Sequence, residues 1–245
     1  MYAKKMVVLS VSTLMLATTF VSPVVGLSNE VFADEIGTKV DTNASLPDSM
    51  LFNKAIANKD FNSSIKISYD GATKISQLVD ENQNVLATEI SNPVTSEVLA
   101  VTRTAKEVIV EKTIKGYNGE YNTQIKHFAL AVINENVDVN DTSSISPRYH
   151  YTPWRYTNLA VGADLFAFLT DLSLTAVVAF TANVFGITLK AADWLLGYMG
   201  AKGLSTGEAL ASALDTSGNG WIGLYVREMW NDSQTVFYGT QHKTM

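Results

Sequence analysis

The feature that most constrains this chain is an uncharged, mostly apolar run from Leu172 to Leu189. As one helix rising about 1.5 Å per residue, this run would be about 27 Å long, close to the hydrocarbon thickness of a bilayer. The wider segment, residues 159–200, fits a helical hairpin that is buried in a water-soluble fold or released into lipid. A pair of core helices in an ordinary secreted domain explains the same residues, so the sequence leaves both interpretations open.

Two groups of residues in this run have distinct predicted roles. The apolar side chains that would contact lipid are Leu172, Val177, Val178, Phe180, Val184, Phe185, Ile187 and Leu189. A stripe of small side chains at helical spacing would let a second helix approach closely. These helix-packing residues are Thr175, Ala179, Ala182 and Gly186.

Acidic residues flank the run. Asp164 and Asp171 lie one heptad apart, nearly on one face of a helix. Each carboxylate would cost about 2.5–3.5 kcal/mol at the centre of a membrane helix. We therefore expect these two acids to act as a switch, keeping the segment in water until a target membrane, a receptor or low pH changes the balance.

The first 33 residues have the pattern of a secretory signal peptide. Lys4 and Lys5 precede an apolar run, and Val31-Phe32-Ala33 ends in a small residue before an acidic stretch. Cleavage after Ala33 would release residues 34–245 outside the cell; an uncleaved N-terminal anchor is the competing interpretation. The sequence has no cysteine, so a secreted fold cannot rely on disulfides and needs an apolar core.

Residues 64–140 are expected to form an antiparallel β domain that follows a loose arm, residues 34–63. Short strand-like runs separated by polar turns recur here, at 64–68, 73–79, 85–90, 98–103, 108–114 and 125–133. No helical period lies between them, which favours an antiparallel meander or small sandwich over βαβ units. The predicted fold class is α+β, with this N-terminal β meander or sandwich followed by the hydrophobic helical hairpin and a C-terminal β-hairpin.

Residues 141–158 are interpreted as a linker into the hydrophobic part, residues 159–245. Its second half carries an aromatic and basic cluster, and two more aromatic residues follow the apolar run. Such side chains prefer the interface between membrane and water, where one end of the ring stays wet. The predicted interface aromatics are Trp154, Tyr156, Trp194 and Tyr198, although they could instead cover the seam between two domains.

One stretch near the C-terminus matches the first part of an EF-hand calcium loop. Asp215, Ser217 and Asn219 would supply oxygen ligands, and Gly220 holds the position of the invariant glycine. Position 12, where a bidentate glutamate is needed, is Val226. Calcium is therefore a weak candidate and no other cofactor is expected, since a glycine-rich turn into the last hairpin explains the stretch more simply.

Little in the sequence supports catalysis or nucleic-acid binding. His127, His150 and His242 are scattered, and neither an HExxH motif, a GxSxG motif nor a cysteine nucleophile is present. Two carboxylates that meet in space could still hydrolyse glycosides, a pairing that sequence cannot show. The net charge of −6 argues against nucleic acid as a partner and against simple adsorption to anionic lipid. We therefore expect no enzyme.

Three features together suggest a family: the signal ending VFA-DE, the cysteine-free β-rich first half, and the Gly/Ala/Val/Phe-rich C-terminal segment with SALDTSGNGWIGLY. In this layout the whole chain resembles the large, unmodified, secreted bacteriocins of the geobacillin twenty-six type found in bacilli. The resemblance implies a secreted, heat-labile antibacterial protein that acts on related Gram-positive cells. The acidic charge differs from that of small cationic bacteriocins, which leaves the mode of attachment open.

The leading hypothesis is a secreted antibacterial protein with a β domain for carriage or recognition. The apolar run of residues 172–189 would act on the membrane of the target cell, with a surface receptor and an immunity protein as further candidate partners. A second hypothesis is a secreted or wall-associated binding protein without toxic activity, in which the apolar helices are core. A secreted hydrolase is the third.

Overall fold

The computed structural model describes residues 46–131, 149–170 and 172–245, and the strands and helices of these ranges belong to one unit. The helices are α1 (Met50–Ala57), α2 (Asp164–Ala167), α3 (Leu174–Phe185), α4 (Leu189–Tyr198) and α5 (Gly207–Leu214). The strands are β1 (Ser64–Asp70), β2 (Thr73–Val79), β3 (Val85–Asn92), β4 (Glu97–Arg103), β5 (Glu107–Lys115), β6 (Tyr121–Ala131), β7 (Tyr149–Tyr151), β8 (Arg155–Gly162), β9 (Trp221–Asn231) and β10 (Phe237–Thr244). The fold is thus mostly antiparallel β-sheet with a few helices, consistent with the predicted α+β class.

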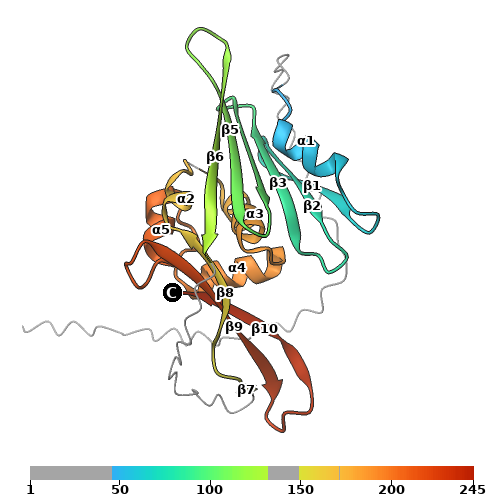
Figure 1. Cartoon of the computed structure of the whole chain (residues 1–245), viewed down its shortest axis with the longest axis vertical. Coiled ribbons are helices and arrows are strands. Elements are labelled where there is room, and N and C mark those ends of the chain that lie inside the picture. The colour runs from blue at the N-terminus through green and yellow to red at the C-terminus, as the bar shows by residue number, and fades with distance from the viewer. Residues whose placement is uncertain (1–45, 132–148, 171) are drawn as a thin grey trace, which may run out of the picture. The chain divides into compact units, whose positions relative to one another are not determined.

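One sheet runs through the described part of the chain, in the order β1-β2-β3-β4-β5-β6-β8-β9-β10, with β7 paired to β9. The strands from β1 to β6 follow one another as an antiparallel meander (Figure 1). Strand β8 pairs with both β6 and β9 and so joins the two halves of the sheet. The sequence placed β7 and the start of β8 in a linker, because two short runs around Pro153 offer too few alternating residues for a strand signal.

Helix α3 packs across β2, β3 and β4 and is buried along almost its whole length. Its side chains share one apolar core with the sheet and with α2, α4 and α5, through residues such as Phe166, Leu195 and Leu210. A helix that is apolar all round needs this kind of enclosure in water. Helices α3 and α4 contact each other, but the helices do not form a clear hairpin.

Residues 172–189 do not form one continuous helix. Ser173 caps α3 at its start by accepting from the Ala176 N–H, and Gly186 ends it with φ 61°, in the left-handed region. Thr188 then caps α4 by accepting from the Ala191 N–H over 3.2 Å. Across the described residues, no helix combines the length and the apolar character needed to cross a membrane.

Gly186 also makes room for a side chain from the sheet. Arg103, the last residue of β4, donates from Nη1 to the carbonyl oxygen of Phe185 over 3.1 Å. A Cβ at position 186 would overlap that same nitrogen. Gly186 was predicted to be a helix-packing residue, and the structure gives it a different role as the left-handed end of α3.

Helix α1 covers the opposite face of the sheet, where two buried glutamates hold its N-terminus. Glu111 on β5 accepts hydrogen bonds from Ser49 Oγ at 3.1 Å, from the Met50 N–H at 3.2 Å and from the Leu51 N–H at 2.7 Å. Glu89 on β3 accepts from the Ser49 N–H at 3.1 Å. Carboxylates are stabilised at a helix N-terminus because its N–H groups are otherwise unpaired.

The two glutamates have unequal environments although both are buried. Burial raises the pKa of Glu89 above its ordinary value, and the hydrogen bond from Ser49 and the charge of Lys74 oppose this shift only in part. The ionised form of Glu89 is therefore disfavoured in the folded protein. Glu111, with three donors, is the main anchor of α1.

We predict that Gly186→Ala lowers the free energy of unfolding by about 1–2 kcal/mol, because an L residue is strained at positive φ and its Cβ would displace Arg103. The matched control is Gly197→Ala within α4, where a Cβ meets nothing within 4 Å. This change should stabilise the protein by roughly 0.5–1 kcal/mol. Denaturant unfolding of both variants checks the pair; equal effects would contradict the described end of α3.

Glu111→Gln is expected to lower the free energy of unfolding by about 1–3 kcal/mol at neutral pH, since one buried and two part-buried donors lose a charged acceptor. Glu89→Gln should be neutral or stabilising there. A group whose folded pKa is raised contributes stability below its unfolded pKa and loses it as pH rises through the folded pKa. The advantage of Glu89→Gln over wild type should thus shrink as pH falls from 7 to about 4, as urea titrations at several pH values would show; a growing advantage would refute it.

Candidate functional site

The apolar residues predicted to contact lipid lie in the core. Val177, Val178, Phe180, Val184, Phe185 and Ile187 are buried, and Leu172 and Leu189 are half-buried. The ring of Phe180 meets that of Phe166 in α2 at a centroid distance of 5.7 Å. In this conformation six of the eight predicted membrane-active side chains are buried in the protein and cannot contact lipid.

The predicted helix-packing residues differ in their burial, and only one of the two flanking acids lies in the described part of the chain. Ala179 and Ala182 are buried against their surroundings, whereas Thr175 is exposed in the first turn of α3. Asp164 is exposed and begins α2, which ends at Ala167. Asp171 lies outside the described residues, so the placement of both acids on one helix face stays a prediction.

Helix α3 carries polar side chains whose hydrogen-bonding groups are unsatisfied. Thr181 and Asn183 are fully buried, and among the described residues neither the Thr181 hydroxyl nor the Asn183 amide has a hydrogen-bond partner. A buried polar group without a partner costs about 1–3 kcal/mol. The free energy of burying α3 in the core is therefore less favourable than it would be for an entirely apolar helix.

Three of the four predicted interface aromatics contact one another, with Trp154 buried and Tyr198 exposed. Trp194 stacks on Tyr198 at 4.9 Å between centroids, and Tyr198 lies 5.9 Å from Trp154. Tyr156 is not part of this group, because its ring packs against Tyr225 at 5.1 Å. The contact between Tyr198 and Trp154 joins α4 to the segment just before β8, which sequence separation alone could not show.

A second set of rings continues from Trp154 along β7 and the β9–β10 hairpin. Arg227 lies between Tyr151 and Trp154, with its guanidinium 4.2 Å and 4.4 Å from their ring centroids. Beyond Tyr151, the ring of Tyr149 lies 6.4 Å away and makes an edge contact with Tyr238 at 5.5 Å. The guanidinium thereby links the two sets by cation–π contacts into one row.

The opposite face of the hairpin is also aromatic near its tip. Trp230 pairs with Phe237 across the strands, and their ring centroids are 5.3 Å apart. A β-bulge between Phe237 and Gly239 inserts Tyr238, whose ring contacts Tyr149 on the other face. We call β7 together with residues 227–241 the aromatic arm. It has rings on both of its faces.

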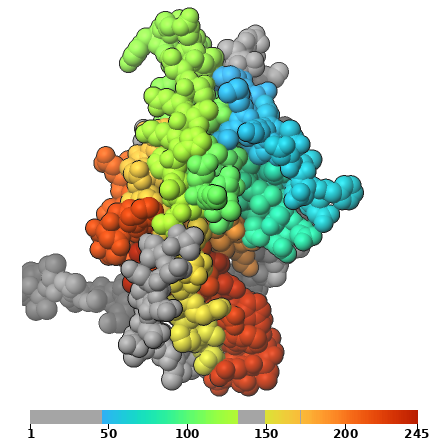
Figure 2. Space-filling model, viewed as in Figure 1, coloured from blue at the N-terminus to red at the C-terminus, as the bar shows by residue number. Residues whose placement is uncertain are grey.

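The aromatic arm extends beyond α4 and the rest of the helices, as Figure 1 shows. In Figure 2 its two parts, red for the hairpin and yellow for β7, lie side by side at the lower end of the view. At its tip Val236, Phe237 and Tyr238 are 50, 50 and 53% exposed. Asn231 orders the tip loop, since its Oδ1 accepts from the N–H groups of Thr235 and Val236 at 2.7 and 3.0 Å.

The residues proposed for calcium form a turn that satisfies its own donors. Asp215 Oδ1 accepts from Ser217 Oγ at 3.0 Å and from the Gly218 N–H at 2.9 Å, while Oδ2 accepts from the Gly220 N–H at 2.8 Å. Asn219 accepts from the Trp221 N–H at 2.8 Å. Within the described ranges, no three histidine, aspartate or glutamate residues are grouped as metal ligands. The loop geometry thus accounts for these side chains as a turn.

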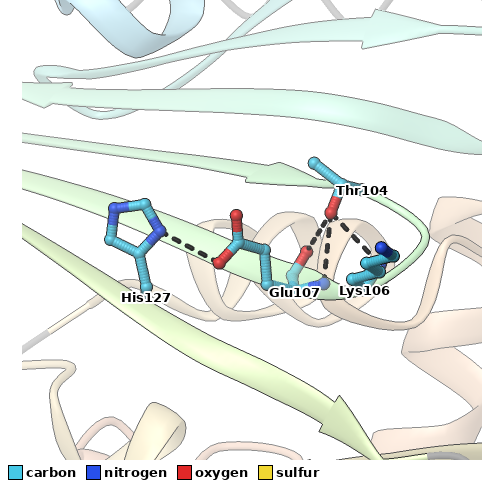
Figure 3. A network of polar contacts seen from close by, with 4 residues as sticks. All are labelled: Thr104, Lys106, Glu107 and His127. Carbon is cyan, nitrogen blue, oxygen red and sulfur yellow. Dashed lines mark hydrogen bonds and ion pairs between the residues drawn. The ribbon is translucent and has the colours of Figure 1, made fainter.

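One histidine pairs with a carboxylate, in an exposed network on β5 and β6 (Figure 3). His127 Nδ1 lies 3.0 Å from Glu107 Oε2. The nearby Thr104 hydroxyl accepts from the N–H groups of Lys106 and Glu107 and thereby closes the β4–β5 turn. The hydroxyl is directed at the backbone of its own turn, so the group lacks the nucleophile–base contact of a hydrolytic triad.

Sequence reasoning missed the hairpin half of the aromatic surface. Trp230, Phe237 and Tyr238, like Arg227, lie in a segment that was predicted only as a terminal hairpin. The available signal was the clustering of aromatic residues on both sides of the Asn231–Val236 turn. None of the protein-family models, curated proteins or solved structures compared with this chain matches it.

Proposed function

We propose that this is a secreted antibacterial protein that attaches to the membrane of Gram-positive cells through the aromatic arm and then permeabilises it. The observation that carries the proposal is the exposure of aromatic side chains on both faces of the arm, at its tip. Tyrosine and tryptophan are favoured at membrane–water interfaces, because their rings leave water while their polar atoms remain hydrated.

A bilayer fits the arm better than a flat protein partner does. A protein surface covers one face of a hairpin, whereas lipid surrounds both faces of an inserted tip. Each half-exposed ring would remove on the order of 100 Å² from water, a gain of about 2–3 kcal/mol at 25 cal/mol per Å². With Phe237 and Tyr238 alone, this contribution outweighs the weak electrostatic repulsion of an acidic protein.

Helix α3 supplies the second step in this proposal. Its twelve residues span about 18 Å, less than the roughly 30 Å of a hydrocarbon core. To cross the bilayer, residues 172–189 would have to form one continuous helix through Gly186. This helix would then pair with a second apolar helix, which is the arrangement of the predicted helical hairpin. The unsatisfied Thr181 and Asn183 favour such a release, since polar side chains can pair between helices in lipid.

The burial of ten of the twelve α3 residues favours a second candidate, a secreted or wall-associated binding protein without toxic activity. In that case the aromatic arm binds a surface and the helices remain core at all times. The two candidates share the attachment step and differ in whether the membrane is breached. Dye release from bound vesicles therefore separates them.

We predict that Phe237→Ser combined with Tyr238→Ser lowers partitioning into phosphatidylcholine–phosphatidylglycerol vesicles by at least about 100-fold, at about 1.4 kcal/mol per tenfold change. The matched control is Phe61→Ser with Tyr117→Ser, which removes the same two ring types at fully exposed positions outside the arm. The β5–β6 turn that holds Tyr117 lies at the opposite end of the view in Figure 1. Vesicle flotation measures the binding of both.

Growth inhibition of a panel of Gram-positive bacteria completes this test. The arm variant should lose killing and dye release together, and the control variant should retain both. Attachment without release or killing by the wild type would favour the second candidate. Equal vesicle binding by the arm variant and the wild type would refute the role of the arm.

A further inference from the structure

Strand β1 forms an edge of the sheet. It pairs with β2 on one side, and the described residues provide no strand on its other side. Ile65, Ile67 and Tyr69 are 41, 55 and 69% exposed. A straight edge strand with exposed apolar side chains presents unpaired N–H and C=O groups and is a template for pairing with another strand.

We propose that β1 pairs with β1 of a second copy of this chain, antiparallel and about a two-fold axis at Ser68. In this register Lys66 faces the second copy's Asp70, and Ile67 faces the second copy's Tyr69. The two-fold axis repeats each pair, so the interface contains two opposite-charge pairs and two pairs of an aromatic with a β-branched side chain. These are the cross-strand combinations that stabilise antiparallel sheets.

The order of side chains along β1 selects this register. Pairing about Ile67 would place Lys66 opposite a serine, and pairing about Lys66 would place two lysines opposite each other. Like charges directly opposite are destabilising, so the register about Ser68 has the best complementarity. A C2 interface of this kind is closed, because each copy presents the same strand to the other.

On each face of the paired strands, this register places complementary side chains opposite each other. Side chains alternate along a strand, so Ile67 and Tyr69 lie on one face while Lys66 and Asp70 lie on the other. Lys66 Nζ donates to Gln83 in the exposed β2–β3 turn, from which it can turn toward the second copy. Since one strand pair buries less than the roughly 1,200 Å² of a small stable interface, the dimer should be weak and depend on concentration.

Analytical ultracentrifugation of the full chain over a range of concentrations tests the proposal, with circular dichroism to establish folding. The wild type should show a monomer–dimer equilibrium. Lys66→Asp alone, and Asp70→Lys alone, should each weaken the dimer by at least about tenfold, because they oppose like charges twice. The double swap Lys66→Asp with Asp70→Lys restores opposite charges and should return dimerisation to within about threefold of wild type.

A wild type that stays monomeric at all concentrations would overturn the proposal. A dimer that tolerates the single charge reversals would overturn it as well, by locating the interface elsewhere. Failure of the double swap to rescue a folded protein would contradict the register. None of these outcomes bears on vesicle attachment through the aromatic arm.

Discussion

The enclosure of α3 by the sheet and the neighbouring helices is the interaction on which the rest of this structure depends. Ten of its twelve residues are buried, and each large apolar side chain taken from water contributes about 1.5–3 kcal/mol. A cysteine-free chain has no covalent cross-link to replace this contribution. The same apolar character that suggests a membrane segment is therefore also what holds the protein together in water.

The sequence predicted the parts of the fold that depend on local pattern. Alternation located β2 to β6 and the terminal hairpin. The end of α3 was not predicted, because Gly186 is read equally well as a helix-packing glycine or as a left-handed cap. What decides between them is Arg103, which lies far away in sequence and occupies the space of a Cβ.

The candidate site was predicted only in part, for a similar reason. Trp154, Trp194 and Tyr198 were chosen for their interfacial chemistry, and they do come together. The row of rings continues through Arg227 to Tyr151 because β7 pairs with β9. This pairing could not be predicted, since a strand of three residues is too short to give a recognisable sequence pattern. The buried carboxylates Glu89 and Glu111 were also unpredictable, since they meet at Ser49 only through the strand register.

The structure separates two properties that the sequence combined in one segment, because apolar character is enclosed in α3 while aromatic side chains are exposed on the arm. The most direct test uses the absence of native cysteine to place one dye at Asp232→Cys in the tip loop or at Thr175→Cys in α3. Time-resolved quenching by brominated lipids should reach the Asp232 label first and the Thr175 label later. An Asp232 label that remains unquenched on vesicle-bound protein would contradict the account.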